Sequence, residues 1–141
     1  MNRGEETEGT PASFRVTLRC DLVEVRPKVD RVRRFLLKTG CEESQALECE
    51  LALVEACTNA IQSVSPQGRH LPVVIDAMVG NGEAEFRVTD HTAGFDWPKQ
   101  PALPDAKSER GRGVFLIQSL MDSVKYVRGP DENVLILRKA L

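Results

Sequence analysis

Two polar side chains, Glu55 and Asn59, interrupt the apolar stretch "LALVEACTNAIQSV". The apolar spacing predicts a long helix over residues 43–63, and residues four apart lie on one stripe of a helix. A carboxylate and an amide supply oxygen donors, which Mg²⁺ prefers together with substrate phosphates. The stripe is therefore either a site for Mg²⁺ and phosphate or an exposed helix face without a role.

The composition of this stripe is unusual for a solvated helix face. Such faces commonly carry pairs of opposite charge, which stabilise helices. No Lys or Arg occurs between Glu42 and Gln67. Apart from Ala52, the other members of the stripe are polar: Glu48, Gln62 and Ser63. The apolar residues of the remaining sectors, Leu51 among them, predict a wide buried face.

Two further segments could recognise a nucleotide. In "VTDHTAGFD", Asp90 ends a predicted strand, where a carboxylate can accept a hydrogen bond from an exocyclic amine. Gly94 follows, and glycine allows the backbone to approach a flat ring. In "ERGRGVFLIQSLMD", the triplet 111–113 stands before a predicted helix, whose free backbone N–H groups and dipole attract anions. The three elements together are more specific than any one of them.

The order of predicted elements indicates the fold class. Strands and helices do not alternate one by one, so a parallel doubly wound sheet is not expected. The pattern favours an α+β two-layer sandwich, with a mixed, mostly antiparallel sheet and helices on one face. The predicted elements are a strand (13–20), a helix (27–39), the long helix (43–63), two strands (71–79 and 83–90) around Gly80-Asn81-Gly82, a proline-containing loop (91–112), a short helix (113–123) and a closing hairpin (124–139) around Gly129-Pro130.

Length and composition exclude several classes of protein. The 141 residues suffice for one domain, with 41% hydrophobic and 28% charged residues and a net charge of -2. This composition lacks the basic excess of nucleic-acid binders and any apolar run of membrane-spanning length. We expect a disordered lead-in over 1–12, one domain over 13–141 and a cytoplasmic location. The four cysteines form no CxxC pair, so we expect buried thiols rather than a zinc site or disulfides.

At this point the motifs resemble those of a known family. "VEACTNAI" resembles the N box of the GHKL-type ATPases (Bergerat fold), and "DHTAGFD" resembles their first glycine box. "GRGVFLIQSLMDSVKY" resembles their second glycine box, most closely that of the anti-sigma-factor serine/threonine kinases of bacterial partner-switching systems. The resemblance covers roughly residues 13–141. One departure is Thr92, which stands where the first glycine box usually has its first glycine.

The resemblance implies ATP and Mg²⁺ as cofactors and assigns roles to individual residues. Asn59 would ligate Mg²⁺, and Glu55 would be the general base for a serine hydroxyl. Asp90 would bind the adenine amino group and Gly94 would allow close contact with the ring. The residues that would cap the phosphates are Gly111, Arg112 and Gly113.

The resemblance also implies partners. They are an anti-anti-sigma protein of the STAS type, phosphorylated on serine or threonine, and a sigma factor held inactive while bound. A homodimer is implied as well, whereas direct contact with nucleic acid or a membrane is not. Two alternatives stay open: a nucleotide-dependent partner-switching module without kinase activity, which the Thr92 departure favours, and an interaction domain that has lost ATP. The loop over 95–110 is expected to act as a lid.

Overall fold

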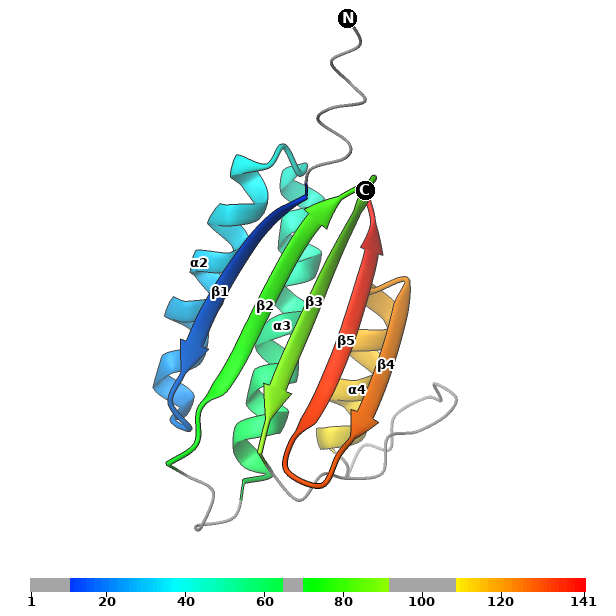
Figure 1. The fold of residues 1–141 in the computed structure, drawn as a ribbon. Helices are drawn as coiled ribbons and strands as arrows, with labels where there is room; N and C mark the ends of the chain where they lie inside the picture. Colours follow the sequence, from blue (N-terminus) through cyan, green and yellow to red (C-terminus); the bar gives the residue numbers. More distant parts are fainter. Residues whose placement is uncertain (1–10, 65–69, 92–108) are drawn as a thin grey trace, which may run out of the picture.

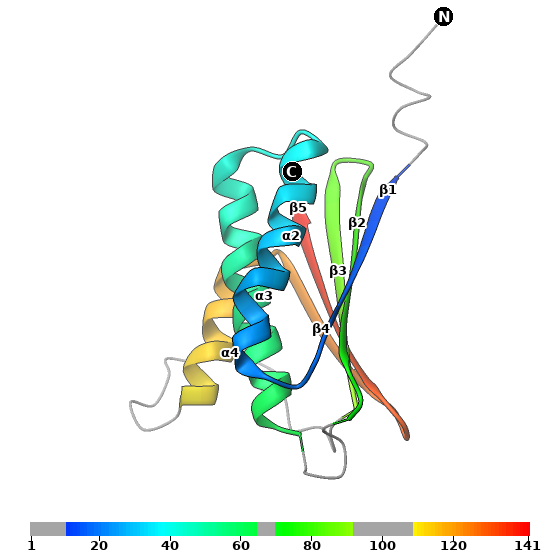
Figure 2. The same ribbon diagram turned by 90° about the vertical axis from the view of Figure 1, so that its left-hand side faces the viewer.

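Five strands form one sheet, and helices cover one of its faces (Figures 1 and 2). The computed structural model describes residues 11–64, 70–91 and 109–141. Its elements are β1 (Ala12–Leu18), the 3₁₀ helix η1 (Leu22–Glu24), α2 (Val25–Lys38), α3 (Glu43–Gln62), β2 (Val73–Gly80), β3 (Glu83–Asp90), α4 (Glu109–Leu120), β4 (Ser123–Arg128) and β5 (Asn133–Ala140). The predicted α+β two-layer sandwich is confirmed.

The strand order is β1-β2-β3-β5-β4, and each of these neighbouring pairs is antiparallel. The predicted sheet was mixed, so this detail was wrong for the described strands. The reason lies in the path of the chain after β3. The segment containing α4 carries it to the sheet edge, where β4 forms, and β5 then turns back between β4 and β3. Had β4 paired with β3 directly, that pair would have been parallel.

The two hairpins form where the turn residues predicted them. Between β2 and β3, Asn81 and Gly82 have φ values of 55° and 73°, the left-handed conformation that a two-residue hairpin turn requires. Between β4 and β5, the Gly129 N–H donates to the carbonyl of Glu132 at 2.9 Å. Both predicted hairpins are therefore confirmed.

The helices pack on the sheet through apolar stripes at helical spacing. In α2 the buried residues are Val25, Val29, Val32 and Leu36. The central helix, α3, contacts both α2 and α4 as well as the sheet. Four of its buried residues are alanines, Ala46, Ala52, Ala56 and Ala60, whose small side chains let neighbouring helices approach closely. On the sheet, Phe86 of β3 is fully buried beneath this layer.

Two sequence expectations about the helices were wrong. The wide apolar face of α3 is not wholly buried: Leu51 is 41% exposed and Leu47 is 51% exposed. Neighbouring helices flank α3, so its outward side faces solvent, while Asn59 of the predicted polar stripe is buried. Helix α4 begins at Glu109, so Gly111 to Gly113 lie inside it rather than before it. Packing of α4 on α3 outweighs the low helix propensity of these glycines.

The ends of four elements meet at one end of the molecule. Figure 1 shows the carboxyl ends of α3 and β3 beside the amino ends of α4 and β5. Residues far apart in the sequence are thereby brought to one edge of the sandwich. In the described part of the chain, no helix combines the length and the apolar character needed to cross a membrane.

Candidate functional site

A pocket of about 320 Å³ lies between α3 and α4, at the end of the molecule where these termini meet. Pockets for small ligands commonly enclose roughly 300–1,000 Å³. Helix α3 contributes one polar stripe to its wall and α4 contributes its first turns. The lining residues are Glu55, Thr58, Asn59, Gln62, Arg112, Gly113 and Leu116.

Glycine at position 113 permits the close approach of the two helices in this pocket. A Cβ atom built on Gly113 would lie 2.9 Å from Glu55 Oε2 and 3.4 Å from Asn59 Nδ2. The first distance is shorter than ordinary van der Waals contact, and the second lies at the short end of that range. The absence of a side chain at 113 therefore leaves room for the carboxylate and the amide against the α4 backbone.

Asn59 is a buried polar group whose hydrogen bonding is incomplete. The residue is 5% exposed, and its Nδ2 atom has no hydrogen-bond partner among the described residues. Buried polar atoms are satisfied in the great majority of cases, so an orphaned one calls for an explanation. The carboxamide lines the pocket, where a ligand could complete its hydrogen bonding.

The donor set of this pocket fits Mg²⁺ as it binds with a nucleotide. The described residues contain no group of three or more His, Cys, Asp or Glu side chains that could hold a metal by themselves. Mg²⁺ rarely needs such a cage, because it retains waters and takes one or two protein oxygens plus substrate phosphates. Asn59 offers one such oxygen, and Glu55 adds a carboxylate to the same lining.

A second polar pair lies at the end of β3. Asp90 is 6% exposed, and Asn133, its register partner on β5, is 1% exposed. The Asn133 Nδ2 atom donates to Asp90 Oδ1 at 3.0 Å. Residues Val88 and Leu135, two positions away on the same face of the sheet, are buried apolar residues. The carboxylate thus occupies a core position at the end of the sheet.

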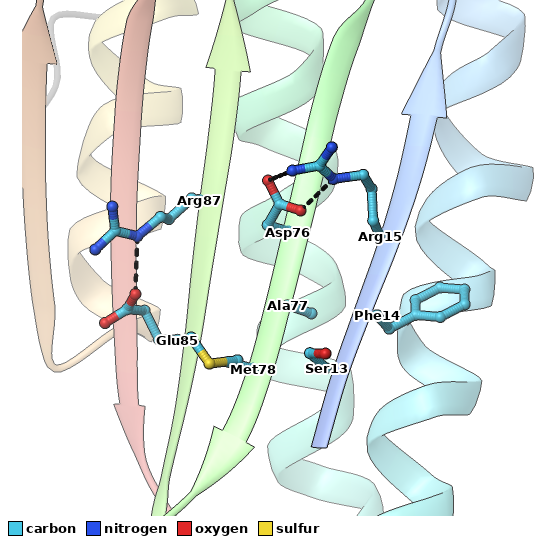
Figure 3. Close-up of a pocket in the computed structure, with 8 residues that line it drawn as sticks. All are labelled: Ser13, Phe14, Arg15, Asp76, Ala77, Met78, Glu85 and Arg87. Carbon is cyan, nitrogen blue, oxygen red and sulfur yellow. Dashed lines mark hydrogen bonds and ion pairs between the residues drawn. The ribbon is translucent and has the colours of Figure 1, made fainter. Parts of the chain in front are cut away.

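A larger cavity, of about 470 Å³, opens on the other face of the sheet (Figure 3). Charged side chains there pair with each other: the Arg15 guanidinium donates to both Asp76 oxygens, at 2.6 and 3.2 Å, and Arg87 contacts Glu85 at 2.9 Å. Arg87, followed by Arg138, lowers the pKa of Glu85 through these hydrogen bonds. None of the residues predicted to bind nucleotide lines this cavity, so its size does not make it the site.

Comparison with known proteins identifies the fold and the family. Residues 18–139 match the family described as Histidine kinase-like ATPase domain. The chain belongs to this family. Membership implies use of a nucleotide and agrees with the α+β architecture observed here.

Individual proteins resemble this chain to different degrees. Serine-protein kinase RsbW of Bacillus subtilis (strain 168) is 32% identical over 97 residues, which is 62% of this chain and 61% of the relative. The chain therefore aligns with less than two thirds of that kinase. The structure of the RsbU and RsbW domains of Rv1364c from Mycobacterium tuberculosis superposes with a TM-score of 0.71 at 16% identity, covering 92% of this chain and 32% of that one.

A further solved structure, the SiaB-SiaC complex from Pseudomonas aeruginosa, superposes with a TM-score of 0.60 at 12% identity. It covers 91% of this chain and 89% of the matched chain. At such low identities both structural matches establish the fold, not the chemistry of the site.

The histidine kinase-like fold brings together some of the predicted site residues and separates others. Glu55, Asn59, Arg112 and Gly113 line one pocket. Asp90 lies at the end of β3, outside that lining, and Gly111 lies in the first turn of α4. Two of the predicted residues, Thr92 and Gly94, lie outside the described residues. So does the expected lid over 95–110, except for its last two residues, which begin α4. The roles of all these residues remain predictions.

Sequence reasoning missed three residues near these sites. Thr58 and Leu116 line the α3–α4 pocket, and Asn133 contacts Asp90. Asn133 had a usable signal, since it falls in alternation with Leu135 and Leu137 and is thus a polar residue at a core position. Leu116 had none, because its contact with the pocket depends on how α4 packs against α3.

Proposed function

We propose that this chain is an ATP-dependent anti-sigma regulatory kinase. It phosphorylates serine or threonine on an anti-anti-sigma partner of the STAS type and sequesters a sigma factor. Its similarity to a serine-protein kinase, RsbW, supports this proposal. The observation that carries it is the contact among Glu55, Asn59 and Gly113, which places a carboxylate and an orphaned amide at the start of α4.

Each residue of the α3–α4 pocket has a distinct task in this proposal. Asn59 holds Mg²⁺, which when bound would neutralise charge on the nucleotide phosphates. Arg112 and the backbone N–H groups of the first turn of α4, where Gly111 lies, face the phosphates, because a helix start attracts anions. Gly113 lets the α4 backbone approach them. Phosphoryl transfer depends mainly on such positioning and charge neutralisation.

Glu55 lies one helical turn before Asn59 and acts as the general base. Its carboxylate takes the proton from the partner's hydroxyl as that oxygen attacks the γ-phosphorus. The bond from the γ-phosphorus to the bridging oxygen breaks, and ADP leaves. General-base assistance typically contributes about 10²–10⁴-fold in rate.

The adenine ring of the nucleotide binds at the second polar pair, Asp90 and Asn133. Asp90 accepts a hydrogen bond from the adenine amino group, and Gly94 allows close contact with the ring. The end of β3, which carries Asp90, and the start of α4 lie at the same end of the molecule (Figure 1). An extended nucleotide could therefore reach both places.

We also propose that the chain forms a homodimer, which sedimentation equilibrium would test directly.

Single-turnover transfer of labelled phosphate tests the kinase proposal. The wild type and Glu55→Gln are mixed with labelled ATP, Mg²⁺ and the cognate STAS partner, and nucleotide affinity is measured in parallel. Glu55→Gln keeps the shape of the side chain and removes the base, so transfer should fall by about 10²–10⁴-fold with nearly unchanged ATP affinity. A matched control is Glu50→Gln on the same helix, whose carboxylate lies 3.7 Å from Arg33 of α2. Undiminished transfer by Glu55→Gln would contradict the assignment.

A second candidate function is a nucleotide-dependent switch without phosphoryl transfer. Thr92, at a position that is usually glycine in the first glycine box, favours this candidate. In that case the wild type would bind ATP and change its affinity for partners, but no labelled phosphate would reach a verified partner. The same experiment therefore separates the two functions.

A further inference from the structure

Asn133 and Asp90 form a polar pair that the apolar core does not require. They are register partners on β5 and β3, and both face the helix layer. Asn133 is 1% exposed, and its Nδ2 donates to Asp90 Oδ1 at 3.0 Å. Burying a carboxylate and an amide is unfavourable compared with burying apolar groups of similar size. Apolar residues at these two positions would stabilise the fold at least as well. A role in binding therefore explains the pair better than a role in stability.

The chemistry of the donor matters for what Asp90 can do. Asn133 donates a hydrogen bond but carries no charge, so it orients the carboxylate without neutralising it. A Lys or Arg at this position would form an ion pair and weaken the carboxylate as an acceptor for a ligand.

We propose that Asn133 is a positioning residue that sets the selectivity of the site for adenine over guanine. This inference rests on the proposed function, in which Asp90 accepts a hydrogen bond from the adenine amino group. Guanine presents a carbonyl oxygen at the corresponding position, and this acceptor is repelled by an acceptor oxygen of Asp90. Rotation about the last side-chain torsion of Asp has only broad preferences. The bond from Asn133 therefore fixes the carboxylate in the orientation that distinguishes the two bases.

Affinities for ATP and GTP, measured by calorimetry with Mg²⁺ on the full chain, test this inference. Asn133→Leu keeps the branching of the side chain but is larger and cannot donate, whereas Asn133→Ser keeps a donor. Val134→Ala, the next residue on the opposite face of the sheet, is the control. We expect the wild type and Val134→Ala to prefer ATP strongly. In Asn133→Leu the ratio of ATP to GTP affinity should fall by about tenfold or more, since hydrogen bonds to charged groups are strong. Asn133→Ser should recover part of that ratio.

The outcomes separate this inference from the proposed function. If the wild type prefers ATP and Asn133→Leu lowers both affinities equally, Asn133 has only a structural role and the inference is wrong. The inference is equally wrong if the ratio of ATP to GTP affinity does not change in Asn133→Leu. Circular dichroism checks that this variant is folded. Should Asn133→Leu fail to fold, the ratio for Asn133→Ser decides. An equal loss of affinity for both nucleotides contradicts positioning, whereas a lower ratio of ATP to GTP affinity supports it. A wild type that binds neither nucleotide overturns the proposed function itself.

Discussion

Gly113 of α4 and Glu55 of α3 approach so closely that a methyl group on the glycine would lie 2.9 Å from Glu55 Oε2. The same methyl group would lie 3.4 Å from Asn59 Nδ2. A glycine inside a helix usually costs about 1 kcal/mol relative to alanine. Helix α4 therefore retains glycine, which stabilises a helix less than alanine does, at a position where a side chain would displace the proposed catalytic carboxylate.

Replacing Gly113 with alanine should separate stability from activity. Because alanine favours the helix and the carboxylate is the movable end of a flexible side chain, Gly113→Ala should keep the free energy of unfolding or raise it by about 1 kcal/mol. Displacement of Glu55 should lower phosphoryl transfer to the partner, by up to about 10²-fold. Chemical denaturation and single-turnover transfer measure the two effects.

The control for this substitution is Ser119→Ala, on the exposed side of the same helix. Its hydroxyl donates to the carbonyl of Phe115 within α4. It should leave transfer unchanged. If Gly113→Ala transferred phosphate at the wild-type rate, the position of Glu55 against α4 would not matter for catalysis.

The reactivity of the thiols tests the buried layer of α3. Burial raises the pKa of both Cys49 and Cys57 to about 12. Because the thiolate is the reactive form, neither should react with a disulfide reagent at pH 8 in the folded protein. Cys20 and Cys41, which are half-buried, should account for the reaction observed.

A colorimetric thiol assay measures this stoichiometry with and without urea. We expect up to two thiols to react in buffer and all four to react in urea. The unfolded protein serves as the internal control for reagent and concentration. Rapid reaction of four thiols in buffer would show that α3 does not pack as described.

The pair of arginines around Glu85 predicts a contribution to stability that depends on pH. Arg87 and Arg138 lower its pKa below the ordinary value of 4.5. A carboxyl whose pKa is lower in the folded state stabilises that state above the unfolded pKa, and the effect disappears as pH falls through the folded pKa. The difference in unfolding free energy between the wild type and Glu85→Gln should thus be constant above about pH 6 and shrink below pH 4.5.

Urea titrations at several pH values measure this difference. We expect it to stay below about 1 kcal/mol, because solvent screens ion pairs on an open sheet face. Glu132→Gln, in the exposed turn before β5, is the control and should show no such trend. A difference that grew on acidification would contradict the assigned direction of the pKa shift.

Local sequence signals predicted much of the fold but less of the site. Asn81-Gly82 dictates its hairpin because few residues adopt positive φ, so the turn was predictable from two residues. The start of α4 was not, since glycine disfavours a helix locally and only packing against α3 extends it through Gly113. Similarly, the stripe containing Asn59 was predictable from helical spacing, but its burial depends on α4, which lies about fifty residues further along the chain.

The pairing of Asp90 with Asn133 shows the same limit. Alternation along each strand assigns both residues to the inner face. Their contact, however, depends on β5 lying beside β3 in a register that pairs these two positions. That register arises from the return of β5 between β4 and β3, which no local pattern specifies.

Binding of Mg²⁺ and ATP to the α3–α4 pocket is the central claim, and calorimetry with Asn59→Ala tests it most directly. Asn59 is the buried amide whose Nδ2 has no partner among the described residues, so its removal should leave the fold intact. The wild type and the control Ser44→Ala, on the exposed amino end of α3, should bind ATP with Mg²⁺. Folded Asn59→Ala should bind at least about tenfold more weakly, a common effect of losing a group at a metal site. Equal affinity in the wild type and in folded Asn59→Ala would contradict the account.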